Sequence, residues 1–158
     1  MNYFELFDLP ISLKVDKSQL AKKYFELQKK YHPDFFTQAD EEGQAAALEK
    51  SSSVNKALKL LQNQDETIKY VLEMKGLLAA DEKYQLPPDF LMEMMDLNEN
   101  LSADSAAAIN EIETSLYDEV KDIIESYNDR TSNESLQKVK AYYFKKKYVQ
   151  RILERLDG

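Results

Sequence analysis

The sequence predicts an all-α protein in two parts, an N-terminal helical hairpin with short flanking helices and a C-terminal three-helix bundle. Only 3 glycines and 4 prolines interrupt 158 residues that are rich in good helix formers. Apolar side chains recur at helical spacing in each long segment between these interruptions. With 43% apolar residues, the chain also has enough apolar surface to bury a core.

The first part begins with two predicted helices. A short helix covers about residues 3–7, and Pro10 follows it. Asp16, with Gln19 three residues later, resembles a capping box that opens the second helix. Apolar residues at helical spacing predict one buried stripe along this helix, formed by Leu20, Tyr24, Leu27 and Tyr31.

The second helix is basic on its other side and leads to the only histidine of the chain. Lys22, Lys23, Lys29 and Lys30 make up this basic strip. Proline disfavours helical geometry in the residue before it, so the helix should end near Tyr31 and expose the tripeptide His32-Pro33-Asp34. This tripeptide predicts a small, rigid recognition tip. The simpler alternative for the lysines is an ordinary solvated face.

Two further helices complete the first part, residues 1–76. A polar loop over 35–40 leads into a long helix over 41–62, which should pack antiparallel to the second helix. Asp65 is predicted to cap a fourth helix that Gly76 ends. The inner face of the third helix is predicted to carry Val54, Ala57, Leu58 and Leu61.

Residues 77–87 are predicted to be a connector, and residues 88–158 a three-helix bundle with helices over about 88–101, 103–128 and 132–156. Thr131 and Glu134 resemble a second capping box. The predicted inner positions are Ile109, Ile112, Leu116, Val120, Ile123 and Tyr127, followed by Leu136, Val139, Tyr142, Val149, Ile152 and Leu156.

The helix after Pro87-Pro88 carries two apolar faces where a surface helix needs only one. The first, Phe90, Met94, Leu97 and Leu101, suffices to seat the helix on its bundle. The second consists of Leu91, Met92 and Met95, bordered by Asp96 and Glu99. Methionine adapts to irregular surfaces, so this face is a candidate for partner binding. The alternative, equally compatible with the periodicity, is that the connector or the first part covers it.

The charge distribution disfavours nucleic-acid binding. The net charge is −8, and residues 77–129 contain 14 acidic residues and 2 lysines, whereas the last 29 residues are basic. Zero cysteines and one histidine disfavour a protein-only zinc or iron site, so no cofactor is expected. The chain starts without a targeting pattern and has no apolar run long enough for a membrane span, which favours the cytoplasm. His32 has no nucleophile nearby in the sequence, so we expect no enzyme.

The order of landmarks in residues 2–75 resembles the J-domain family of chaperone co-factors. These landmarks are a short aromatic helix, a lysine-rich helix, His32-Pro33-Asp34, and a long helix with Asn55-Lys56-Ala57 before a short fourth one. The chain departs from the family after the tripeptide, where Phe35 stands in place of the usual lysine.

Three segments together resemble the HscB family, namely Asn2–Phe7, Tyr31–Asp34 and Asp89–Glu93. Members of this family join a J-domain to a C-terminal three-helix bundle. The resemblance implies a co-chaperone of iron–sulfur cluster assembly. Such a protein binds an IscU-type scaffold and stimulates ATP hydrolysis by an HscA-type, DnaK-like chaperone. Some members carry an N-terminal tetracysteine zinc module; this chain lacks it and so resembles the bacterial type.

The resemblance also implies which residues contact each partner. The chaperone would contact the tip and the basic strip, Lys22, Lys23, Lys29, Lys30, His32, Pro33 and Asp34. The scaffold would contact Leu91, Met92, Met95, Asp96, Glu99 and Phe144, the last of which should point away from the inner stripe of its helix. A further acidic contact of the family is replaced here by Ala103. Two alternatives remain, a J-domain protein for a different client and a helical adaptor without a chaperone partner.

Overall fold

The computed structural model describes residues 1–157, and over these residues it contains seven α-helices, one 3-10 helix and no strand. The prediction of an all-α protein is therefore confirmed. The chain divides into two compact units, Met1–Val71 and Leu72–Gly158, which are called the N-terminal and C-terminal units below. The division falls within helix α4, which runs from Gln64 to Met74.

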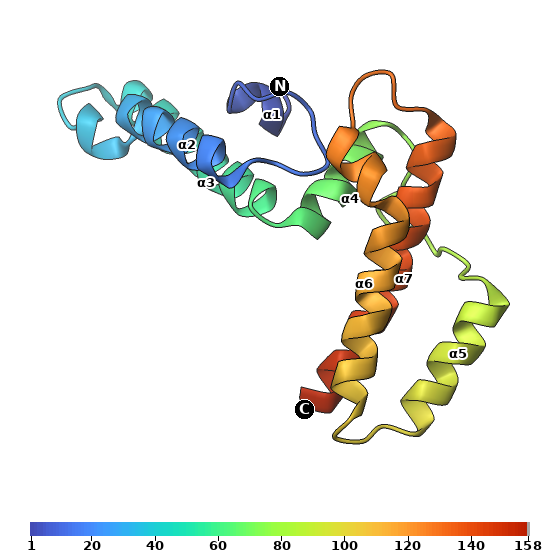
Figure 1. The fold of residues 1–158 in the computed structure, drawn as a ribbon. Coiled ribbons are helices and arrows are strands. Elements are labelled where there is room, and N and C mark those ends of the chain that lie inside the picture. Colours follow the sequence, from blue (N-terminus) through green and yellow to red (C-terminus); the bar gives the residue numbers. More distant parts are fainter. Residues whose placement is uncertain (158) are drawn as a thin grey trace. The chain divides into compact units, whose positions relative to one another are not determined.

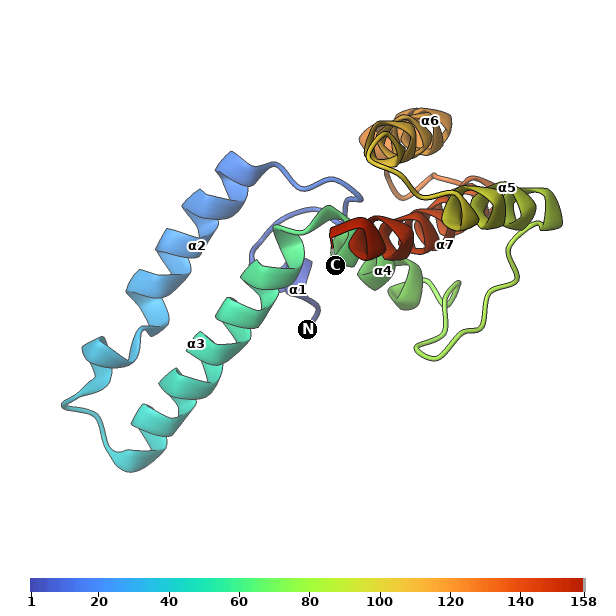
Figure 2. The same cartoon turned by 90° about the horizontal axis from the view of Figure 1, so that it is seen from below.

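The N-terminal unit is built around an antiparallel pair of helices, as predicted. Helices α2 and α3 run side by side in opposite directions, and the short η1 helix lies at the end where they are joined (Figure 2). In chain order the elements are α1 (Tyr3–Leu6), α2 (Lys17–Tyr31), η1 (Pro33–Phe36) and α3 (Glu41–Leu61), followed by α4.

Side-chain caps define where α2 and α3 begin. The Asp16 carboxylate accepts a hydrogen bond from the Gln19 N–H at 3.0 Å, as the predicted capping position requires. Asp40 caps α3 in the same way, through the Gly43 N–H at 2.7 Å. The prediction of a plain loop over residues 35–40 is wrong at its start, because Pro33 begins a 3-10 turn that extends to Phe36.

Two other predicted caps are wrong by one or two residues. Asn63, and not Asp65, caps α4, because its side chain accepts from the Glu66 N–H at 3.0 Å. Ser132 caps α7 by accepting from the Ser135 N–H at 3.1 Å. Thr131 instead accepts from Asn128 in the preceding turn. In both places two residues with capping side chains stand close together, and only the backbone path decides between them.

The core of the N-terminal unit joins all of its helices. It contains Phe4, Phe7, Leu13, Leu20, Ala47, Val54, Ala57, Leu61, Ile68 and Val71. Tyr70 of α4 ties down α1, because its ring stacks on Tyr3 and its hydroxyl accepts from the Tyr3 N–H at 2.9 Å. Of the predicted α2 stripe only Leu20 is fully buried; the Tyr24 hydroxyl is partly exposed and bonds to Asn55 of α3 at 3.0 Å.

The C-terminal unit consists of the end of α4, the connector and three further helices. Gly76 follows α4 with a positive φ of 72°, which favours glycine there. Helices α6 (Ser105–Ser126) and α7 (Asn133–Asp157) pack along each other, and α5 (Pro88–Glu99) runs beside them (Figure 1). The core contains Phe90, Met94, Ile109, Leu116, Val120, Ile124, Leu136, Val139, Tyr142, Val149 and Ile152. Ile124, and not the predicted Ile123, faces inward, because it lies one helical turn after Val120.

Candidate functional site

The His32–Asp34 tip is exposed and held by its own local contacts. His32 ends α2 in an extended conformation and accepts a hydrogen bond from the Asp34 N–H on its Nδ1 atom at 3.2 Å. Pro33 follows as the first residue of η1. The side chain of His32 is 44% exposed and that of Asp34 is 86% exposed. The tip therefore presents an imidazole and a carboxylate to solvent in a fixed relation.

The predicted basic strip forms two adjacent rows along α2, Lys22 with Lys29 and Lys23 with Lys30. Lys22 and Lys29 are exposed, whereas the Lys23 ammonium lies 3.4 Å from the Asp8 carboxylate. The Lys30 ammonium lies 5.3 Å from the centre of the Tyr31 ring, next to the tip. Lys22, Lys29 and Lys30 thus extend the exposed surface of the tip along the helix, and Lys23 also ties α2 to the loop after α1.

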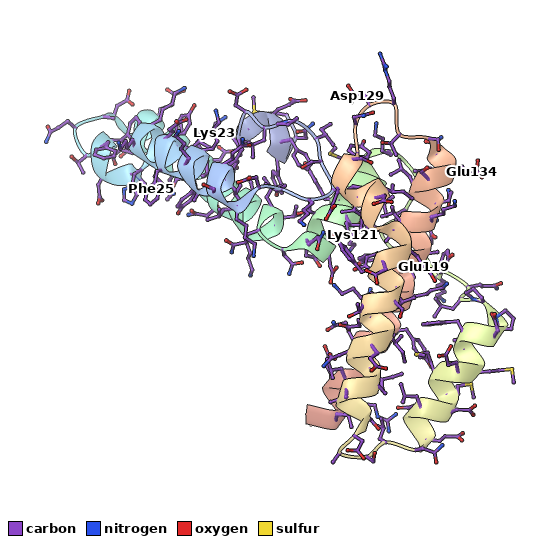
Figure 3. All side chains as sticks on the ribbon, viewed as in Figure 1. Lys23, Phe25, Glu119, Lys121, Asp129 and Glu134 are labelled. Atoms are coloured by element: carbon purple, nitrogen blue, oxygen red, sulfur yellow. The ribbon has the colours of Figure 1, made fainter. Side chains whose placement is uncertain are left out.

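Two exposed aromatic side chains near the tip were not predicted as site residues. Phe25 and Phe35 are each 66% exposed. Phe25 and Lys23 project from different sides of α2 (Figure 3). Phe25 lies three residues after Lys22 and four before Lys29, so it shares the exposed basic side of the helix. The sequence indicated this exposure, because Phe25 lies outside the predicted buried stripe of α2.

Helix α5 has two apolar faces, as predicted. Phe90 and Met94 are buried against the other helices. Met92 is 67% exposed and Met95 is 52% exposed. The alternative that neighbouring segments cover the second face is therefore excluded for these two methionines. The whole exposed face, called the α5 patch below, comprises the partly buried Leu91 with the exposed Met92, Met95, Asp96 and Glu99.

Phe144, predicted to point away from the inner stripe of α7, contacts the connector. Its ring is half-buried and stacks on that of Tyr84, with centroids 4.6 Å apart and planes within 6°. The Lys140 ammonium lies 5.7 Å from the centre of the Tyr84 ring and 2.6 Å from the Glu82 carboxylate. These contacts of Glu82 and Tyr84 with Lys140 and Phe144 are called the clamp below. They could not be predicted from the sequence, because the partners are far apart in the chain.

The Glu82 carboxylate gives the clamp a defined pH dependence. Its hydrogen bond with Lys140, assisted by the Ala79 N–H, lowers its pKa below the ordinary value of 4.5. Because the folded-state pKa is lowered, ionised Glu82 stabilises the clamp at pH values above the ordinary pKa. This contribution is lost as the pH falls through the folded-state pKa. We therefore expect the Tyr84 ring resonances to stay constant near neutral pH and to shift below about pH 4.5. The measurement is an NMR titration. A Glu82→Gln variant with the same transition would contradict this assignment.

Neither a metal centre nor a membrane span is found in the part of the chain that the structure describes. No group of three or more histidine, aspartate or glutamate side chains in residues 1–157 is arranged to hold a metal ion. No helix in the same range is long and apolar enough to cross a bilayer.

Comparison with known proteins decides the family. The co-chaperone protein HscB of Proteus mirabilis is 31% identical over 172 residues, which cover 100% of this chain and 99% of that protein. The chain belongs to the HscB family. An HscB homolog of Colwellia psychrerythraea is 34% identical over 90% of each chain. The profile of the HscB C-terminal oligomerisation domain matches residues 86–157.

Solved HscB structures extend the similarity to the fold. The chaperone HscB from Vibrio cholerae matches with a TM-score of 0.69 and 28% identity, covering 99% of this chain and 96% of that one. The human co-chaperone HscB matches with a TM-score of 0.81 and 25% identity, covering 99% and 81%. Both parts of the chain therefore follow the HscB architecture, and the resemblance stated from the sequence is confirmed. The relatives are named co-chaperones and not enzymes.

Proposed function

We propose that this chain stimulates ATP hydrolysis by a DnaK/HscA-type chaperone and delivers an IscU-type iron–sulfur scaffold to it. In this proposal residues 1–76 act as the J-domain, residues 77–87 connect, and residues 88–158 bind the scaffold. Membership of the HscB family, together with the exposed His32–Asp34 tip, supports it. The single observation that carries the proposal is the exposure of this tip at the C-terminal end of α2, outside the buried core.

The J-domain acts by differential binding and not by chemistry of its own. Exposed lysines steer the basic side of α2 toward an acidic surface of the chaperone. His32, Pro33 and Asp34 then favour the hydrolysis-competent arrangement of the ATP-bound chaperone, since a ligand shifts an equilibrium by its differential affinity. The ATP-hydrolysing groups belong to the chaperone, so this chain has no catalytic residue in the proposal.

The α5 patch and Phe144 hold the scaffold. Met92 and Met95 offer adaptable apolar surface, and Asp96 and Glu99 add charge at its border. Because the same chain holds both partners, the scaffold is present at the chaperone at a high effective concentration. The chain has no cysteine, which fits a protein that moves the scaffold without ligating its cluster. We place this action in the cytoplasm.

A steady-state ATPase assay with purified partners tests the proposal. Adding this protein to an HscA-type chaperone should raise its ATP turnover, and a scaffold titration should show direct binding. Turnover that never rises would favour the adaptor without a chaperone partner. A rise in turnover without scaffold binding would favour a J-domain protein for a different client.

A further inference from the structure

The face of α7 that carries Phe144 continues in a stripe that the scaffold contacts described above do not include. Phe144, Lys147, Tyr148 and Arg151 recur at spacings of three and four residues, so they share one side of the helix. Opposite them runs the connector with Lys83 and Tyr84. Together with Glu82 and Leu86, these six residues border a hollow of about 280 Å³, called the connector groove below.

The connector groove lies beside the α5 patch. The Tyr148 ring meets the Phe90 ring of α5 edge-to-face, with centroids 6.2 Å apart. One helical turn beyond Arg151, the Arg155 guanidinium donates to the Asn98 side chain of α5 at 2.8 Å. Asn98 follows Leu91 by seven residues and Met95 by three, so all three lie on one side of α5. The groove and the α5 patch are therefore adjacent parts of a single surface.

The two parts of this surface have opposite charge. The groove presents the exposed side chains of Lys83, Lys147 and Arg151, and its one carboxylate, that of Glu82, is paired with Lys140. The α5 patch presents Asp96 and Glu99. Aromatic rings and Leu86 form the apolar part of the groove, and Leu91 with two methionines forms that of the patch. A partner complementary to both must place basic groups over the patch and acidic groups over the groove.

The stacking of Tyr84 on Phe144 limits how a partner can reach Phe144. One face of the Phe144 ring is covered by Tyr84, and the ring also makes a T-shaped contact with Tyr143 at a centroid distance of 5.2 Å. A side chain that touches Phe144 therefore enters the groove beside Tyr84. There it lies close to Lys147 one turn along α7 and to Lys83 on the connector.

We propose that the connector groove is a second contact site for the scaffold and takes a segment that carries carboxylates beside an apolar side chain. The apolar side chain packs on Tyr84, Phe144 and Tyr148, and the carboxylates pair with Lys83, Lys147 and Arg151. This inference rests on the proposed function, because the α5 patch supplies the neighbouring contact. It assigns roles to five residues that the scaffold contacts predicted from the sequence do not include.

Charge reversal on α7 tests the groove directly. Lys147→Glu with Arg151→Glu should weaken binding of a purified IscU-type scaffold about tenfold or more at low salt, mainly through slower association. The deficit should shrink at high salt, because exposed charges are screened. Neutralising the same residues to Gln should weaken binding less than reversal does. Lys138→Glu is the matched control, since this exposed lysine lies on α7 outside the groove and should bind as the parent does.

The outcomes separate this inference from the proposed function. Circular dichroism of each variant should match the parent, since Lys147 and Arg151 are exposed. If the charge-reversed variant binds as the parent does at all salt concentrations, the proposal that the groove contacts the scaffold is overturned, and the proposed role of the α5 patch is unaffected. Equal losses for Lys138→Glu and the reversed variant would show a general charge effect and would also overturn it. A parent that binds no scaffold would overturn both proposals together.

Discussion

Replacing His32 by glutamine should abolish stimulation of the chaperone, with ATP turnover falling to that of the chaperone alone. The imidazole is 44% exposed and its Nδ1 accepts from the Asp34 N–H, so it is accessible to a partner and also sets the geometry of the tip. A flexible glutamine side chain cannot reproduce this fixed ring. Because the site is exposed, we expect the free energy of unfolding to change by less than about 1 kcal/mol.

Two controls make the His32→Gln result specific. Gln38→Ala changes an exposed residue between η1 and α3 and should stimulate like the parent. The affinity of the His32→Gln variant for the scaffold should also equal that of the parent, since the proposed scaffold contacts lie in the C-terminal unit. A folded His32→Gln variant that stimulates as well as the parent would show that the tip is not the chaperone contact.

Truncating Leu91 and Met92 to alanine together should weaken scaffold binding about 100-fold, because each anchor buried on binding contributes about 1.5 kcal/mol. Stimulation of the chaperone in the absence of scaffold should not change. Met92 is 67% exposed and Leu91 is only partly buried, so the loss of folding stability should be small. Titration calorimetry with purified scaffold measures the affinity, and thermal unfolding measures the stability.

Two other methionines provide the contrast for this pair. Met94→Ala removes a side chain that is 0% exposed and should cost about 2–5 kcal/mol of folding stability. Met74, 37% exposed at the end of α4, can be changed to alanine without affecting scaffold affinity. If the Leu91→Ala, Met92→Ala variant binds scaffold as tightly as the parent, the client contact lies elsewhere.

The helices could be predicted from the sequence because long amphipathic segments alternate with a few strong breakers. Asp16 marks the start of α2, and Pro33 marks its end by disfavouring helical geometry in the preceding residue. The helical spacing of apolar residues indicates the extent of α3. The caps Asn63 and Ser132 were missed because each stands near another residue able to cap. Periodicity also cannot separate Ile123 from Ile124, since both adjoin the inner face.

The exposure of the candidate site residues was predictable where local sequence determines geometry. Exposure of the His32–Asp34 tip follows from Pro33, and exposure of Met92 and Met95 follows from a second apolar face on α5. The clamp of Glu82 on Lys140 and the stacking of Tyr84 on Phe144 join residues about 60 positions apart. Such contacts depend on how the connector folds back onto α7, which no local pattern encodes.

In the proposed function, one chain carries both activities and links them. The most direct measurement is chaperone ATP turnover with scaffold present, comparing the parent with an equimolar mixture of His32→Gln and the Leu91→Ala, Met92→Ala variant. The mixture contains every contact, but never both on one chain. We predict that the parent and scaffold stimulate more than additively and that the mixture does not. A mixture that matches the parent would contradict delivery by a single tethering chain.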